Sequence, residues 1–134
     1  MNILLDTHIL LWAMMDRPTL SPKAREIITK NRNSLYYSIV SIWEIAIKHK
    51  LHPDNLLSSG ADVAKVCQEA NLRSLSLANE HIATFEKLTR KEDAPGHKDP
   101  FDQILISQAI AEKMIFLTHD KTLQYYDGVD IKIV

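Results

Sequence analysis

Cysteine is almost missing from this sequence: Cys67 is the only one among 134 residues. A single cysteine cannot close a disulfide within the chain, and no spacing of cysteine and histidine resembles a zinc site. This usage fits a reducing compartment. A chain of this length can bury an apolar core without disulfide bonds or a structural metal, so we expect that kind of stabilisation.

Long apolar runs are missing as well. A membrane-spanning helix needs about 18 or more consecutive apolar residues, and no segment approaches that length. The apolar segment 1–15 lacks the basic start of a signal peptide and carries Asp6 in its interior. These absences predict a cytoplasmic protein that does not associate with membranes.

Neither sign of charge is in excess, because 16 Lys and Arg residues balance 17 Asp and Glu residues. Overall charge therefore gives no indication of nucleic-acid binding, and a polyanionic partner must be held by local patches or by a metal. Repeats, low-complexity tracts and linkers are also missing. With 46% hydrophobic and 25% charged residues, the composition predicts one globular domain over residues 1–134.

The sequence does contain alternating strand and helix patterns. Apolar, β-branched or alternating runs predict strands at residues 2–5, 35–40, 72–77, 114–118 and 131–134. Helical spacing and capping residues predict helices at 8–14, 22–31, 41–50, 60–71, 79–89 and 99–111, with a helical turn at 121–125 and a tight turn at 52–55. The predicted class is α/β, with a mainly parallel central sheet between helices on both faces.

Several helix starts are assigned from capping chemistry. Ser41 and Glu44 form the pattern of a capping box, and Asn79 is placed to cap a later helix. Asp99 as the N-cap and Pro100 at the first helical position are a favourable helix start, so helix capping explains an aspartate at position 99. It does not account for Asp102, whose neighbours at i+3, i+4 and i+7 are apolar and belong to the face turned toward a core.

Four acidic residues fall at or just beyond predicted strand ends: Asp6, Glu44, Asp102 and Asp120. Taken singly, each has a structural explanation: a helix cap for Asp6, the capping box and an i+4 pair with Lys48 for Glu44, and a turn for Asp120.

Together these acids predict a crowded acidic cluster, because the carboxyl ends of parallel strands meet at one edge of a sheet. Two unit charges ~5 Å apart repel by about 3 kcal/mol at an effective dielectric of ~20. Such a cluster must hold protons or bind a cation. Carboxylate ligands favour a hard ion, Mg²⁺ or Mn²⁺, and such ions assist phosphodiester hydrolysis.

Four segments carry a resemblance to a known family: Ile3-Leu4-Leu5-Asp6-Thr7-His8, Ser41-Ile42-Trp43-Glu44-Ile45, Asp99-Pro100-Phe101-Asp102-Gln103-Ile104-Leu105-Ile106 and Leu117-Thr118-His119-Asp120. In this order and spacing the chain resembles the PIN-domain ribonucleases, and among them the VapC-type toxins of toxin–antitoxin pairs. The resemblance covers essentially the whole chain. It implies a three-layer PIN-like fold, a homodimer, RNA cleavage, and a cognate antitoxin whose tail covers the acidic pocket.

The resemblance also assigns roles to residues. It implies that Asp6, Glu44, Asp102 and Asp120 are catalytic and bind Mg²⁺, that Asp99 is an additional candidate ligand, and that Thr118, Ser41 and Thr7 support them. Candidate RNA contacts near these acids are Lys48, Lys98, His97, His119 and Lys121. The histidines are otherwise expected mostly at the surface.

Trp12 and Trp43 lie on apolar helix faces, which favours a place in the core or in a dimer interface over base stacking.

Two other functions use the same acids. A Mg²⁺-dependent phosphatase or phospho-acceptor module also has aspartates at strand ends, but Leu5-Asp6-Thr7 lacks the second aspartate that a phosphatase places close behind the first. A non-catalytic module would use its acids only to receive the basic tail of an antitoxin. Acyl-phosphate labelling of Asp6 would favour the former, and partner binding without metal-dependent RNA cleavage would favour the latter.

Overall fold

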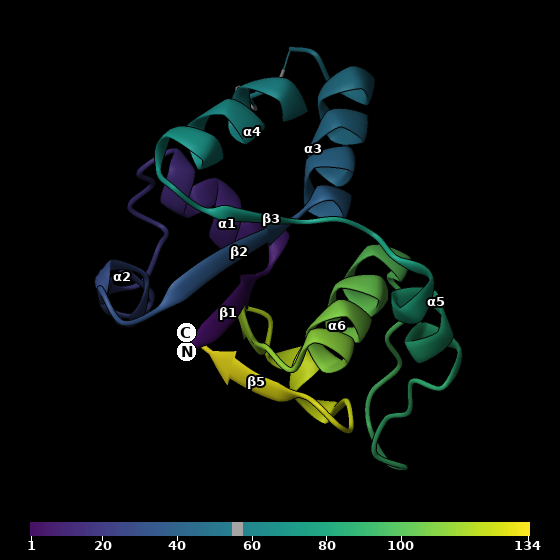
Figure 1. Ribbon diagram of the computed structural model, residues 1–134. Helices are drawn as coiled ribbons and strands as arrows, with labels where there is room; N and C mark the ends of the chain where they lie inside the picture. The colour runs from purple at the N-terminus through teal and green to yellow at the C-terminus, as the bar shows by residue number, and fades with distance from the viewer. Residues whose placement is uncertain (55–57) are drawn as a thin grey trace.

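The computed structural model describes residues 1–54 and 58–134 (Figure 1). Within these ranges one sheet contains five parallel strands in the order β3-β2-β1-β4-β5. The strands are β1 (Asn2–Leu5), β2 (Ser34–Ser38), β3 (Arg73–Leu75), β4 (Ile115–Thr118) and β5 (Asp130–Ile133). The helices are α1 (Thr7–Met14), α2 (Pro22–Thr29), α3 (Ile39–Leu51), α4 (Gly60–Glu69), α5 (Asn79–Glu86), α6 (Pro100–Glu112) and the 3₁₀ helix η1 (Lys121–Tyr125).

The sheet separates two apolar cores, because successive side chains of a strand point to opposite faces. Ile3 and Leu5 of β1 belong to a core with buried residues of α1, α2, α3 and α4. Leu4 belongs to the other core, which contains buried residues of α6 and η1. Both faces of the sheet are thus covered, and the predicted three-layer α/β fold is confirmed (Figure 1).

The predicted capping box at Ser41 is wrong. Strand β2 ends at Ser38, and the hydroxyl of Ser38 accepts a hydrogen bond from the amide of Val40 at 3.0 Å, so the N-cap of α3 lies three residues earlier than expected. Ser41 lies fully buried in the first turn of α3. Glu44 consequently lies in the second turn of this helix and not at a strand end.

The predicted cap of α5 is also wrong. The N-cap residue is Ala78, whose amide donates to Nδ1 of His81 at 3.0 Å. His81 is 1% exposed, contrary to the surface position expected for most histidines, and its Nε2 lies 3.0 Å from a carboxylate oxygen of Glu112. This contact ties α5 to α6.

Other boundaries differ by a few residues. The second, fourth and fifth helices end at residues 29, 69 and 86, and β3 covers only residues 73–75 of the predicted strand. Helix α4 ends because Asn71 adopts a left-handed backbone with φ of 62°. Of the tight turn predicted at 52–55, residue 55 lies outside the described residues. Among the described residues, none of the helices combines the length and the apolar character needed to cross a bilayer.

Candidate active site

Asp6 joins the first strand to the first helix. It follows β1 directly, caps α1 and is 4% exposed. Its Oδ1 accepts from the amide of Thr7 at 2.7 Å, and its Oδ2 accepts from the hydroxyl of Thr118 at 2.6 Å. Because Thr118 ends the neighbouring strand β4, the two central strands hold this carboxylate in one orientation.

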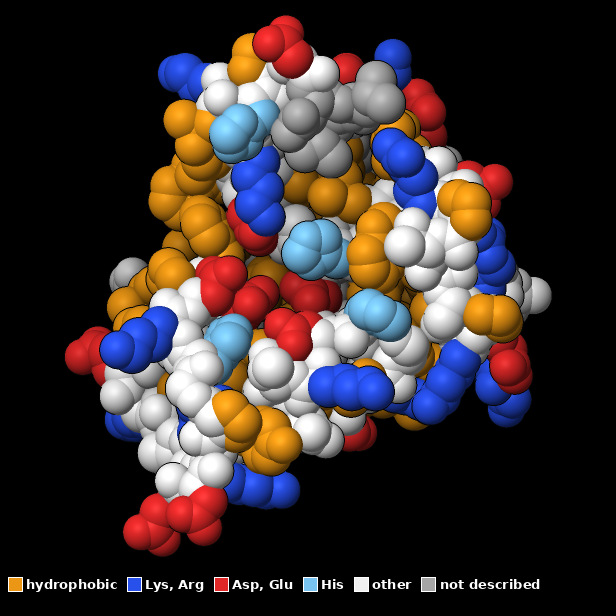
Figure 2. Space-filling view, turned by 180° about the vertical axis from the view of Figure 1, so that it is seen from behind, with side chains coloured by type: hydrophobic (Ala, Val, Ile, Leu, Met, Phe, Trp, Pro, Cys, Tyr) orange, Lys and Arg blue, Asp and Glu red, His pale blue; other side chains and the backbone are white. Residues whose placement is uncertain are grey.

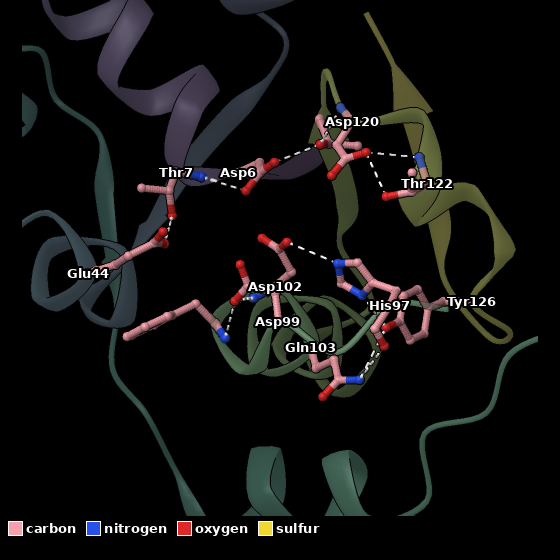
Figure 3. A network of polar contacts seen from close by, with 12 residues as sticks. Asp6, Thr7, Glu44, His97, Asp99, Asp102, Gln103, Asp120, Thr122 and Tyr126 are labelled. Carbon is pink, nitrogen blue, oxygen red and sulfur yellow. Dashed lines mark hydrogen bonds and ion pairs between the residues drawn. The ribbon is translucent and has the colours of Figure 1, made fainter. Parts of the chain in front are cut away.

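Glu44 faces Asp6 from α3 and is 5% exposed (Figure 3). Its Oε1 accepts from the hydroxyl of Thr7 at 2.8 Å, and its Oε2 accepts from Lys48 at 2.8 Å, one helical turn later. Thr7 Oγ1 also lies 3.0 Å from the hydroxyl of Ser41. The sequence-predicted supporting residues Thr7, Ser41 and Thr118 therefore all contact the acids or each other.

Asp102 and Asp99 occupy the start of α6 but differ in their surroundings. Asp99 is exposed and caps the helix, accepting from the amides of Phe101 at 2.9 Å and Asp102 at 3.4 Å. The side chain of Asp102 is only 17% exposed, and Oδ2 of Asp102 lies 3.2 Å from Nε2 of His97. Capping accounts for Asp99, whereas Asp102 lies among the other carboxylates (Figure 3). Metal ligation by Asp99 stays a prediction.

Asp120 follows β4 and begins η1. Its Oδ1 accepts from the amide of Thr122 at 2.9 Å and from the hydroxyl of the same residue at 2.7 Å. Its own amide donates to Thr118 Oγ1 at 3.0 Å, so Thr118 connects Asp120 to Asp6. The side chain is exposed, and of the four predicted acids it is the most accessible to solvent.

Burial and neighbouring charges raise the pKa values of two of these carboxyl groups. Burial raises the pKa of Asp102 to about 8, with further contributions from the charges of Asp6, Asp99, Glu44 and Asp120. Burial also raises the pKa of Asp6, against the hydrogen bonds from Thr118 and Thr7. These acids are therefore close enough to oppose one another's ionisation, as predicted. The predicted strand-end positions hold for Asp6 and Asp120 but are wrong for Glu44 and Asp102, which lie within α3 and α6.

Asp120 behaves differently. Burial acts to raise its pKa, but the two hydrogen bonds from Thr122 and the nearby charges of His97 and His8 outweigh burial, so the pKa is lowered. The cluster thus contains a readily ionised acid beside one that holds its proton. Burial is the main cause of the raised pKa of Asp102, and a divalent cation would neutralise the carboxylate repulsion that adds to it. Oxygen donors suit Mg²⁺ or Mn²⁺. The donor set therefore fits such an ion.

His97 belongs to the cluster, although sequence reasoning considered it only as an RNA contact. One ligand atom from each of His97, Asp102 and Asp120 lies within 4.8 Å of the other two. His97 stands two residues before the helix cap, in a loop whose path the sequence does not specify. The sequence indicates only that His97 is near the start of α6, and it does not predict the contact between His97 and Asp102.

The other candidate RNA contacts differ in their surroundings. Lys48 pairs with Glu44, and Nδ1 of His119 lies 2.6 Å from the carbonyl oxygen of Val134. Lys98 and Lys121 are exposed. Figure 2 shows acidic side chains gathered in the middle of one face, with histidine, lysine and arginine side chains around them.

The two tryptophans lie in different surroundings. Trp12 is half-buried between the rings of His8 and His119. Trp43 is 60% exposed and contacts Phe101 edge-on, so a core position is wrong for this residue.

The fold and the site define an α/β protein with an acidic cluster at the carboxyl ends of its central parallel strands. The family model of the PIN domain matches residues 3–129, so the chain belongs to the PIN domain family. No curated protein sequence gave a significant match.

Solved structures show the same fold at low sequence identity. The structure of VapBC2 from Rickettsia felis bound to a DNA fragment from their promoter has a TM-score of 0.73 at 17% identity, over 99% of this chain and 98% of that chain. DNA-bound VapBC from Salmonella typhimurium has a TM-score of 0.66 at 13% identity, over 99% and 98%. FitAcB from Neisseria gonorrhoeae has a TM-score of 0.59 at 16% identity, over 96% and 95%.

Proposed function

We propose that this protein is a Mg²⁺-dependent endoribonuclease that acts as the VapC-type toxin of a toxin–antitoxin pair. The observation that carries the proposal is the crowding of carboxylates at one sheet edge, where the neighbouring charges help to raise the pKa of Asp102. Membership of the PIN domain family supports nuclease chemistry. A cluster whose ionisation is opposed by its own members is well suited to a divalent cation.

In this proposal Asp6, Glu44, Asp102 and Asp120 hold Mg²⁺, with Mn²⁺ as a substitute and Asp99 as a further candidate ligand. Held by these residues, such a cation would supply Lewis-acid chemistry, polarising a phosphoryl oxygen and lowering the pKa of the attacking water. The protein's contribution is rigidity: the threonine hydroxyls that donate to Asp6 and Glu44 keep both carboxylates in place before substrate arrives.

In this proposal, positively charged side chains around the acidic cluster hold the RNA backbone. Lys98 and Lys121 are exposed near the starts of α6 and η1, and Lys48 is held close to the acids by Glu44. His97 and His119 complete the set of candidate contacts. Such cations attract phosphates by charge and do not read the bases, so we expect binding that weakens with added salt.

The biological setting follows from the resemblance. We propose that residues 1–134 form a single domain and that two copies of the chain form a homodimer in the cytoplasm. A cognate antitoxin inhibits this dimer. The antitoxin is supported by the likeness of the fold to that of VapBC complexes.

The phosphatase or phospho-acceptor alternative is weakened by the sequence around Asp6. A phosphatase places a second aspartate close behind the first, and Leu5-Asp6-Thr7 lacks it. The binding-only alternative has the same site and differs in activity, so experiment must separate it from the nuclease.

The test is cleavage of a mixed RNA substrate by the wild type, D6N and D102N, with Asp130→Asn as the matched control at an exposed position on β5. We expect cleavage that requires Mg²⁺, is lost in EDTA, and falls by at least about 10²-fold in D6N and D102N but not in D130N. Undiminished cleavage in EDTA, or in both site variants, would contradict the proposal. Tight antitoxin binding without any cleavage would support the binding-only module.

A further inference from the structure

A chain of hydrogen bonds leads from α6 back to Asp102 (Figure 3). The side-chain amide of Gln103 donates to the hydroxyl oxygen of Tyr126 at 3.3 Å. That oxygen lies 2.6 Å from Nδ1 of His97, whose Nε2 lies 3.2 Å from Oδ2 of Asp102. The contacts run in one direction, because the Tyr126 oxygen accepts from Gln103 and keeps its own hydrogen to donate.

The placement of hydrogens follows from the state of Asp102. A carboxylate that ligates a cation is ionised, and its oxygens can only accept hydrogen bonds. Nε2 of His97 must then carry the hydrogen that meets Oδ2. Its Nδ1 can accept from Tyr126, so both ring nitrogens are committed, and neither offers a lone pair to a metal.

Tyr126 is itself held firmly. It is 5% exposed, and the guanidinium of Arg90 lies 5.1 Å from the centre of its ring. Arg90 and Tyr126 form an antiparallel bridge, and the amide of Asp127 donates to the carbonyl of Thr89 at 3.0 Å. The segment before α6 is thus paired with the segment before β5. This pairing fixes the hydroxyl that orients His97.

We propose that His97 is a positioning residue of the metal centre and not one of its ligands. It holds Oδ2 of Asp102 from Nε2, Tyr126 holds His97, and the second oxygen of Asp102 is left on the side of the other carboxylates (Figure 3). This inference rests on the proposed function, since it concerns the same cation. Hydrogen bonds of this kind orient ligands and often change metal affinity 10- to 100-fold when removed.

The competing arrangement makes His97 a ligand. It is a real alternative, because the ligand atoms of His97, Asp102 and Asp120 lie within 4.8 Å of one another. Ligation through Nε2 would require Asp102 to release that nitrogen. The two arrangements therefore predict opposite results for nitrogen bound to the metal.

The experiment measures Mn²⁺ binding to the full-length protein without RNA, by the electron paramagnetic resonance signal of free Mn²⁺. We expect the dissociation constant to rise about tenfold in His97→Ala and several-fold in Tyr126→Phe. His97→Gln should restore most of the affinity, since its amide nitrogen can donate from nearly the position of Nε2. Electron spin-echo modulation of the wild type should show no directly bound imidazole nitrogen.

Matched controls are Tyr125→Phe and His52→Gln. Tyr125 is the last residue of η1 and directly precedes Tyr126, and its hydroxyl makes no hydrogen bond to the described part of the chain. His52 is exposed and follows α3. Both controls should bind Mn²⁺ as the wild type does. A bound imidazole nitrogen in the wild type, or unchanged affinity in folded H97A and Y126F proteins, would overturn the inference.

The result also separates this inference from the proposed function. Mn²⁺ binding that D6N and D102N abolish, with His97 and Tyr126 variants unaffected, would leave the metal centre intact and remove only the positioning role. Mn²⁺ binding that neither D6N nor D102N weakens would contradict the metal centre itself. Circular dichroism of each variant shows that it is folded.

Discussion

Asp102 illustrates how tertiary surroundings reverse a local preference. In the first turn of α6 the helix dipole favours a negative charge. Burial and the charges of Asp6, Asp99, Glu44 and Asp120 nevertheless raise its pKa to about 8. Without a cation, Asp102 therefore holds its proton at neutral pH, and a divalent ion must displace that proton when it binds.

This perturbation predicts a pH dependence of stability in the metal-free protein. A carboxyl group whose pKa is raised from 3.8 to about 8 on folding stabilises the folded state fully below pH 3.8 and loses that contribution as pH rises toward 8. Asp102→Asn cannot ionise, so in EDTA its advantage over the wild type should grow from pH 5 to pH 8 and exceed about 1 kcal/mol, or about 3–5 °C in Tm.

Thermal unfolding of both proteins across this pH range measures the difference directly. D130N is the control, because Asp130 is exposed and lies on β5. Parallel stability curves for the wild type and D102N would show that the acids do not interact as the structure indicates.

Among the elements, α3 shows how one helix start determines the place of a functional side chain. The helix begins after Ser38, whose hydroxyl caps the amide of Val40 and also donates to the side-chain oxygen of Gln108 at 2.6 Å. Both contacts are buried. By linking the end of β2 to α6, Ser38 sets the rotation of α3 that turns Glu44 toward Asp6.

Ser38→Ala should therefore cost more than the loss of an ordinary cap. It removes the cap and leaves the Gln108 oxygen without its buried donor, so we expect a loss of about 2–3 kcal/mol in the free energy of unfolding. Ser59→Ala, which removes the more exposed cap of α4, should cost about 1 kcal/mol. Urea denaturation measures both, and equal losses would contradict a structural role for the link to Gln108.

For the whole molecule, strand order brings the acids together. β1 lies between β2 and β4, so the helix after β2 and the loop after β4 flank Asp6 at the same edge. Helix α6 reaches this edge from the other face of the sheet and adds Asp102 (Figure 1). The folded state therefore contains an acidic cluster that the unfolded chain lacks, and in the proposed function this cluster holds the cation.

Magnesium should consequently stabilise the folded protein. At 100 times its Kd a ligand bound only by the folded state adds about 2.7 kcal/mol, so the Tm should rise with Mg²⁺ concentration and return to its starting value in EDTA. D102N should show a much smaller rise. Thermal unfolding at matched ionic strength measures this effect, and an equal rise in both proteins would indicate non-specific salt stabilisation.

The fold class and three of the four acid positions could be predicted from local pattern. Strand and helix signals depend on side-chain periodicity and capping within a few residues, and these identified the layers and placed Asp6, Asp102 and Asp120 at the ends of elements. Local pattern failed at Ser41 and Asn79, because the sequence alone does not decide which of several neighbouring residues caps a helix. In the folded chain the N-cap residues are Ser38 and Ala78, which packing places at these helix starts.

The contacts around the acids depended on tertiary structure. The hydrogen bonds from Thr118 to Asp6, from Thr7 to Glu44 and from His97 to Asp102 join different elements, and no local periodicity encodes them. Their geometry follows from strand order and from the path of loops. The amino-acid pattern thus specifies which acids the protein has and what surrounds each locally, while the folded chain alone sets their distances and mutual repulsion, since these arise only when separate segments meet.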